Sequence, residues 1–186
     1  GSEAVAAIGA VGILTWMTQS ISLMNKVGAE VTVGHSIGAQ NAEEAKMFAS
    51  HNLTIGLLVS LVWGALLFVF AHPVISLYKL EPEITDMAVE YLRIVATGFP
   101  FVFLASAFTG IHNAAGLSKI PFYVSGSGLL LNMILDPHFI LGFGWGTAGA
   151  AYATWLSECA VVLLFVYQLK VRNKLWPGFR FFVRLK

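Results

Sequence analysis

The stretch NLTIGLLVSLVWGALLFVF, residues 52–70, decides the fold class because it is mainly apolar and contains no charged residue. It lies inside a longer segment, 47–78, that also lacks Asp, Glu, Lys and Arg. A helix that crosses a bilayer needs about 20 mainly apolar residues. Four more long segments are free of charge in the same way: 4–25, 94–118, 120–135 and 137–157. The sequence therefore predicts an all-α membrane protein, a bundle of about five transmembrane helices.

The composition of the 186-residue chain supports this prediction. Hydrophobic residues make up 57% and charged residues 11%, with a mean hydropathy of +0.75, whereas a soluble domain has about 25% charged residues. A membrane β-barrel is disfavoured because its strands are short and alternating, and these segments are continuously apolar. The single cysteine, Cys159, excludes an internal disulfide and a cysteine-based zinc site. A net charge of +1 without a basic face also argues against nucleic-acid binding.

Local signals place the expected helices at 3–38, 42–71, 84–114, 120–141 and 147–172. Glycine, asparagine and proline residues separate them, as in the pair His72-Pro73 and the turn GFGWG at 142–146. Pro100 follows Gly98 and Phe99 inside the third helix, where apolar sequence continues on both sides. We expect Pro100 to kink this helix and serve as a hinge.

The distribution of basic residues predicts the orientation of the chain. If the first helix starts outside, eight basic residues face the cytoplasm and one, Lys79, lies in an outer loop. Basic residues accumulate on the cytoplasmic side of membrane proteins, so a plasma-membrane protein with a cytoplasmic carboxyl terminus is expected. The tail 173–186 mixes basic and aromatic residues, which suits either a segment at the lipid surface or a linker to further chain. The start GSEAVAAIGA lacks a Met and a basic flank, so we expect an internal start.

The fourth expected helix carries an isolated carboxylate, Asp136, in one of the most apolar parts of the chain. No Lys or Arg lies within sixteen residues of it, and Asn132 precedes it by one helical turn. Pro137 follows directly and has no N–H, so the carbonyl of Met133 loses its helical partner. These oxygens predict a small cation site, at which Na⁺ binds or a proton neutralises the carboxylate. A structural role for Asp136, as a cap or as the partner of another helix, is the alternative.

Two more pairs of polar residues lie one helical turn apart in the expected spans. Thr154 and Glu158 share a face of the fifth helix, and a short turn makes this helix an antiparallel neighbour of the fourth. Thr154 is then expected to face Asp136, or else to bond the carbonyl of Ala150. On the first helix, Lys26 and Glu30 form either a neutral structural pair or part of a relay or gate, a role also open to Glu158.

No catalytic constellation is visible, so an enzyme is not expected. The five histidines are scattered, no metal motif occurs, and no cofactor other than Na⁺ or H⁺ is predicted. The surface that contacts a substrate cannot be chosen from the sequence, because aromatic and Met residues line cavities and face lipid alike. Four residues are compatible with either role: Phe99, Phe101, Phe103 and Met133.

Four segments resemble the amino-terminal lobe of the multidrug and toxic compound extrusion (MATE) transporters. They are GAEVTVGHSIGAQNAEEAK at 28–46, AFTGIHNAAGLSKIPFYVSG at 107–126, GLLLNMILDPHFILG at 128–142 and TAGAAYATWLSE at 147–158. The resemblance implies a protein of twelve helices in two lobes that exchanges Na⁺ or H⁺ for organic cations. It also implies that Asn132, Asp136 and Thr154 match positions of a cation site in the amino-terminal lobe.

By this resemblance, residues 1–172 are a partial amino-terminal lobe that supplies helices two to six of the twelve. The first helix and the carboxyl-terminal lobe are then missing partners, and 173–186 is a cytoplasmic tail or the start of the inter-lobe linker. The expected function is a secondary active antiporter that exports small organic cations or drugs from a lipid membrane. Two alternatives stay open: a flippase for lipid-linked precursors with a related fold, and a membrane fragment that does not transport.

Overall fold

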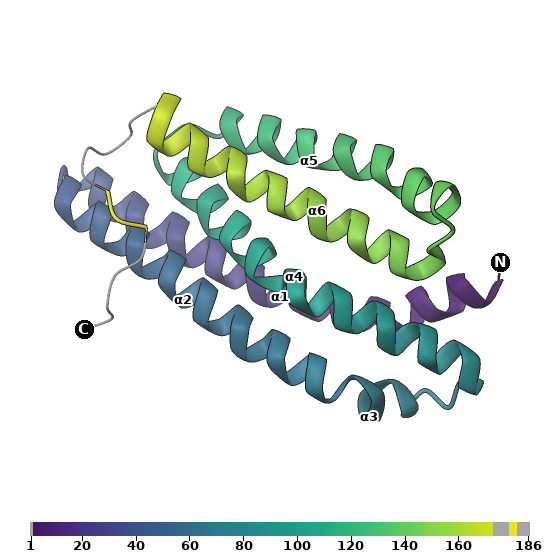
Figure 1. Cartoon of the computed structure of the whole chain (residues 1–186). Helices are drawn as coiled ribbons and strands as arrows, with labels where there is room; N and C mark the ends of the chain where they lie inside the picture. The colour runs from purple at the N-terminus through teal and green to yellow at the C-terminus, as the bar shows by residue number, and fades with distance from the viewer. Residues whose placement is uncertain (1, 173–178, 182–186) are drawn as a thin grey trace.

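The fold is a bundle of long helices, seen in a computed structural model that describes residues 2–172 and 179–181 (Figure 1). The elements are α1 (Ser2–Gly38), α2 (Ala42–Val69), α3 (Ala71–Ser76), α4 (Pro82–Ala114), α5 (Lys119–Pro137), the π-helical turn η1 (His138–Gly142), α6 (Gly146–Tyr167) and the π-helical turn η2 (Gln168–Arg172). In the described part of the chain, five helices are long and apolar enough to cross a membrane. The predicted all-α membrane fold is therefore confirmed.

Helix α4 is the centre of the bundle. It packs against α1 and α2 on one side and against α6 on the other, and α5 packs chiefly against α6 (Figure 1). The expected antiparallel pairing of the last two spans is present as the pair α5 and α6. Two clusters of buried apolar side chains hold these contacts, one around Phe108 and Phe165 and the other around Leu92 and Phe99. Because α4 contributes to both clusters, it joins the two halves of the bundle.

Short polar and glycine-containing turns end the helices. Asn41 caps α2, and its side chain accepts a hydrogen bond of 3.1 Å from the backbone N–H of Glu44. Gly116 has a φ of +73°, and the following Leu117 N–H donates to the carbonyl of His112 at 2.8 Å. This left-handed conformation suits glycine, which has no Cβ, and it turns the chain from α4 into α5.

Near proline, the second and fourth spans depart from a single continuous α-helix. The second span ends at Val69, and a short helix, α3, then runs through Pro73. Pro73 is tolerated there because the N–H groups of a first helical turn have no partner within the helix. The fourth span leaves the α-helical pattern after Pro137 and continues as η1, where the N–H of Phe143 donates to the carbonyl of His138 at 3.0 Å. The fifth span changes in the same way to η2 at Gln168.

The described part of the tail, residues 179–181, lies against the bundle. Phe181 packs on Phe108 with 5.9 Å between ring centroids, and the Nζ of Lys170 lies 4.7 Å from the Phe181 ring centroid. Ser50 donates a hydrogen bond to the backbone carbonyl of Arg180. The predictions for the rest of 173–186 fall outside the described residues.

Candidate functional site

A polar cavity lies between α1, α4, α5 and α6, the four helices that carry most of the predicted site residues. Its volume is about 310 Å³. Each helix contributes at least one polar side chain to its wall. The polar residues are Gln19, Lys26, Ser106, Thr109, Ser125, Asn132, Thr154, Ser157 and Glu158. Among the predicted site residues, this set contains Asn132, Thr154, Glu158 and Lys26.

Asn132 and Thr154 meet across the contact of α5 with α6. The amide Nδ2 of Asn132 donates to the hydroxyl of Thr154 at 3.4 Å. Thr154 in turn donates to the carbonyl of Ala150 at 3.1 Å, which is the bond expected from a membrane threonine. Thr154 was expected either to face Asp136 or to bond Ala150; it bonds Ala150 and accepts from Asn132, one turn before Asp136 on α5.

Asp136 lies one helical turn beyond this pair and does not line the polar cavity. Its Oδ1 is buried and has no hydrogen-bond partner among the described residues. A buried polar atom of this kind needs an explanation, because more than nine in ten such groups in proteins are paired. The predicted structural role, as a cap or an ion-pair partner, has no support in these contacts.

Tyr91 of α4 lies within electrostatic range of Asp136, and nothing in the sequence marked it as part of the site. Tyr91 precedes Val102, which lines the polar cavity, by eleven residues. Eleven residues are close to three helical turns, so both lie on one face of α4. This spacing could have indicated Tyr91 as a site residue, but only if the face of α4 that meets the cavity were already known.

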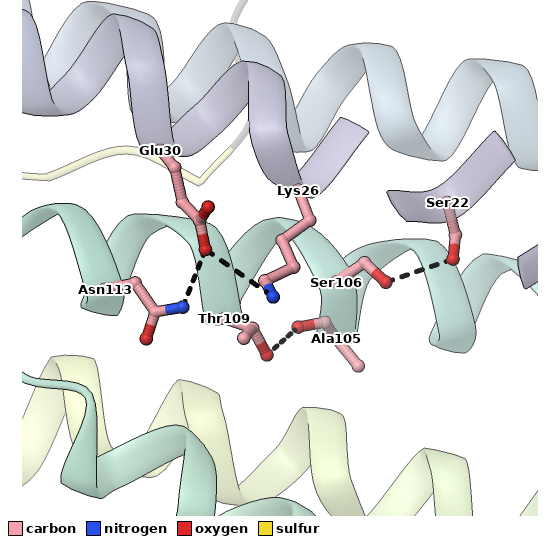
Figure 2. A network of polar contacts seen from close by, with 7 residues as sticks. All are labelled: Ser22, Lys26, Glu30, Ala105, Ser106, Thr109 and Asn113. Carbon is pink, nitrogen blue, oxygen red and sulfur yellow. Dashed lines mark hydrogen bonds and ion pairs between the residues drawn. The ribbon is translucent and has the colours of Figure 1, made fainter. Parts of the chain in front are cut away.

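Lys26 and Glu30 form the predicted pair on α1, with 3.6 Å between Nζ and Oε1. Figure 2 shows that α4 completes the pair, because Asn113 donates to the same Oε1 at 2.7 Å. A turn away, Ser106 of α4 donates to Ser22 of α1 at 3.2 Å. Thr109 points its hydroxyl back to the carbonyl of Ala105. The Oε1 of Glu30 therefore has two partners, Lys26 and Asn113. Lys26 also lines the polar cavity.

Glu158 of α6 lines the same cavity without a hydrogen bond or ion pair in the described part of the chain. Nothing in the contacts tests its predicted relay role. The two predicted hinges occupy different places: Pro100 lies inside α4, and Pro137 is the last residue of α5, where η1 begins.

The four residues that the sequence left compatible with lipid or with a cavity have different surroundings in the structure. Phe99 and Phe103 are buried in the core, and Met133 is 62% exposed on the outside of α5. Phe101 lines a second cavity, of about 930 Å³, between α4, η1 and α6. None of the four borders the polar cavity.

The polar groups around Asn132 are mainly oxygen donors. Within residues 2–172 and 179–181, no three His, Cys, Asp or Glu side chains gather as a metal site would require. Carboxylate, amide and hydroxyl oxygens are the groups available, and such oxygens prefer hard cations.

Comparison with known proteins identifies the family. The family model MatE matches residues 1–138. The chain belongs to the MatE family. This MatE chain is 31% identical over 177 residues to the probable multidrug resistance protein YoeA of Bacillus subtilis, covering 93% of this chain and 38% of YoeA.

Two further MatE relatives extend this comparison. A Shewanella oneidensis protein named FAD transporter is 27% identical over 179 residues, covering 94% of this chain and 40% of that protein. A crystal structure of MATE in the straight conformation matches with a TM-score of 0.92 and 26% identity, covering 100% of this chain and 42% of that one. The chain therefore spans about two fifths of the length of these relatives. The resemblance expected from the four sequence segments is confirmed, and the chain is an integral multi-pass membrane protein.

Proposed function

We propose that this chain is part of a secondary active transporter that exchanges Na⁺ or H⁺ for small organic cations or drugs. The observation that carries the proposal is the buried Oδ1 of Asp136, which has no partner in the described chain. An ionised carboxylate at membrane depth is unfavourable by about 2.5–3.5 kcal/mol on insertion scales. A bound Na⁺ or proton removes most of that penalty, so the site has a physical reason to bind one.

The neighbouring groups give the proposed ion site its selectivity for a small cation. Asn132 and Thr154 lie one turn away, and their amide and hydroxyl are already joined across α5 and α6. Ion binding near Asp136 changes the charge at the end of α5, beside Pro137 and the π-helical turn. In this proposal, α5 then repacks against α6, and Pro100 lets α4 follow. Glu158, Lys26 and Glu30 are candidates for passing the charge change along the cavity.

The substrate class rests on the names of relatives. YoeA is named for multidrug resistance, and the Shewanella relative is named for FAD transport. Substrates differ among relatives of similar identity, so the names alone do not give the substrate. We propose organic cations or drugs because the polar cavity is lined mainly by acidic and neutral residues. Lys26 is the one basic group of that lining, and Glu30 pairs with it. The flippase alternative needs free cationic groups for a pyrophosphate, so this pair argues against it.

We further propose that other helices complete the transporter, including the first helix and the carboxyl-terminal lobe that the resemblance implies. The chain covers 38% of YoeA, which leaves room for both. We also propose that the assembly lies in the plasma membrane, with its basic carboxyl-terminal end in the cytoplasm. Reconstitution of this chain alone tests the non-transporting alternative: flux that appears only when the rest of the transporter is supplied would show that the chain is one module.

The test of ion coupling is Asp136→Asn in the transporter to which we assign this chain. Export of ethidium from vesicles is measured under a Na⁺ gradient and, separately, under a proton gradient. We expect gradient-driven export to fall about 5–150-fold, the range of ordinary coupling free energies. Asp86→Asn, at an exposed position near the start of α4, is the matched control and keeps wild-type export. Gradient-driven export that survives in Asp136→Asn would contradict the proposal.

A further inference from the structure

Residues 179–181, which we call the strap, contact three different elements at one end of the bundle. Figure 1 shows the strap in yellow beside α2, at the end of the bundle where α2 begins. The strap contacts α2 through Ser50, α4 through Phe108, and η2, the continuation of α6, through Lys170. Ser50 lies near the start of α2, Phe108 near the end of α4, and Lys170 just beyond the end of α6. The strap therefore touches three spans at the same end of the molecule.

The hydrogen bond from Ser50 differs from the one that a helical serine usually makes. Serine and threonine hydroxyls inside helices commonly donate to the carbonyl four residues earlier. Thr54, one turn later on α2, makes such a bond to the carbonyl of Ser50 at 2.9 Å. Ser50 is 3% exposed and donates instead to the carbonyl of Arg180, 130 positions away. This bond fixes which residue of the strap lies over α2.

Phe108 joins the strap to the contact between α4 and α6. It stacks on Phe165 of α6, with ring centroids 5.6 Å apart and an interplanar angle of 19°. Phe181 of the strap meets the same ring edge to face, with centroids 5.9 Å apart and an angle of 74°. Edge-to-face contacts are favourable for aromatic pairs. Phe181 thus packs on the ring that holds α4 to α6.

Lys170 adds a contact from the end of the sixth span. Its Nζ lies 4.7 Å from the centroid of the Phe181 ring, and a cation within about 6 Å of an aromatic centroid is attracted to the ring. Lys170 follows Phe165 by five residues on a helix that continues from α6 into η2. A movement of this helix away from α4 would therefore disturb the contact of Phe165 with Phe108 and the contact of Lys170 with Phe181.

From these contacts, we propose that the strap clasps the ends of α2, α4 and α6, and that these ends separate only after the strap undocks. Separation of any two of the three elements breaks at least one contact of the strap, because it binds all three. A segment attracted only to a lipid surface would need neither the bond from Ser50 nor a ring packed on Phe108. The proposal does not depend on the ion-coupling role of Asp136.

The first test measures how strongly the docked strap resists trypsin. A protease cleaves the transiently opened state, so the initial rate of cleavage after Arg180 reports undocking. The rate for each purified variant in uncharged detergent is divided by the rate for the same variant in urea, which corrects for the changed sequence. Phe181→Ala should raise this ratio about tenfold or more, because it removes an aromatic pair and a cation–π contact. Lys170→Gln should raise it about two- to fivefold, since only the cation–π contact is lost.

Two variants serve as controls for this test. Phe181→Tyr keeps the aromatic ring and should keep the wild-type ratio. Phe122→Ala makes the same change as Phe181→Ala at a position on α5 that is 75% exposed, and it should also cleave as wild type. A thermal unfolding curve for each variant shows whether faster cleavage reflects a loss of fold.

The second test measures whether the strap holds the helix ends together. Spin labels at Met47 of α2 and Tyr167 of α6, which are 46% and 52% exposed, report the spacing between these ends in a Cys159→Ser background. We expect one narrow distance distribution for the parent and for Phe181→Tyr, and a broader distribution that extends to longer distances for Phe181→Ala.

Three results would overturn the proposal. The first is an unchanged cleavage ratio in Phe181→Ala, which would mean that the ring does not dock the strap. The second is an unchanged label distance in Phe181→Ala although protection is lost, which would mean that the strap docks without clasping the helices. The third is an equal gain in cleavage in Phe122→Ala, which would show that the effect is not specific to the strap.

Discussion

Glu30 and Asp136 are both carboxylates inside the long helices, and the structure gives partners to Glu30 but none to the Oδ1 of Asp136 among the described residues. Glu30 has Lys26 one turn before it and receives a second hydrogen bond, from Asn113 of α4. Asp136 has a buried Oδ1 without a partner in the described chain. A satisfied carboxylate stabilises the bundle, whereas an unsatisfied one keeps free capacity for an ion. The comparison separates a structural acid from a functional candidate.

The helices that carry or contact these two acids are packed to different degrees. α4, which binds Glu30 through Asn113, buries fourteen of its 33 residues, and α5 buries three of its 19, Pro121, Val124 and Gly128. A helix with few buried contacts needs less free energy to shift. In the described chain, Asp136 therefore lies on the less buried of these two helices.

The largest expected effect tests the difference in packing between α4 and α5. A Cβ at Gly110 of α4 would lie 2.9 Å from the Cβ of Ala29 and closer still to the backbone carbonyl of Lys26. Gly110→Ala should lower the free energy of unfolding by about 1–3 kcal/mol through overpacking. Gly126→Ala on α5 meets nothing within 4 Å and should be neutral or stabilising, because alanine favours helices. Thermal unfolding in detergent measures both, and equal changes would break the comparison.

An intermediate effect is expected at Glu30. Glu30→Ala leaves Lys26 and the donor of Asn113 without their acceptor, and the side chains of the ion pair are 30% and 32% exposed. We expect a loss of about 1–2 kcal/mol in unfolding free energy, the upper range for hydrogen bonds between membrane helices. Glu43→Ala removes the other Lys–Glu pair, whose Glu43 side chain is 86% exposed, and should change little. Chemical unfolding in detergent compares them, and the reverse order would show that Glu30 is not structural.

The smallest effect on stability is expected at Asp136. Asp136→Asn removes no hydrogen bond of Oδ1, since that atom has none in the described chain. The free energy of unfolding should therefore stay within about 0.5 kcal/mol of wild type, because asparagine keeps the shape of the side chain and removes no bond of that atom. The same unfolding measurement gives the answer. A loss as large as that of Glu30→Ala would mean that Asp136 holds the bundle together.

The helices themselves could be predicted because the lack of charge over about 20 residues is a property of the chain alone. The pair Lys26 and Glu30 could be predicted for a similar reason, since neighbours four residues apart meet on any helix. Contacts between helices depend on how far each slides along the next. The hydrogen bond from Asn132 to Thr154 depends on that register, which local sequence does not determine.

Two other features could not be predicted from the sequence, because they also depend on how the helices pack. Tyr91 is close to Asp136 only because α4 presents that face toward α5 and the polar cavity. The second cavity gathers residues from α4, η1 and α6, which are up to 66 positions apart, from Glu90 to Leu156. Among the aromatic residues that line it, the sequence left Phe101 open between lipid and a cavity, and the packing of the helices separated the two.

The most direct measurement of the central claim is chemical labelling of Asp136 with a hydrophobic carbodiimide, read by mass spectrometry of the purified chain. The reagent adds to a protonated carboxyl group in an apolar setting, and a bound ion or a lost proton blocks it. We predict that Asp136 is labelled at neutral pH and that Na⁺, or a rise in pH if the coupling ion is H⁺, suppresses the label, while Glu30 stays unlabelled. If Asp136 takes no label, or takes the same label regardless of Na⁺ and pH, it does not bind the coupling ion and the account is contradicted.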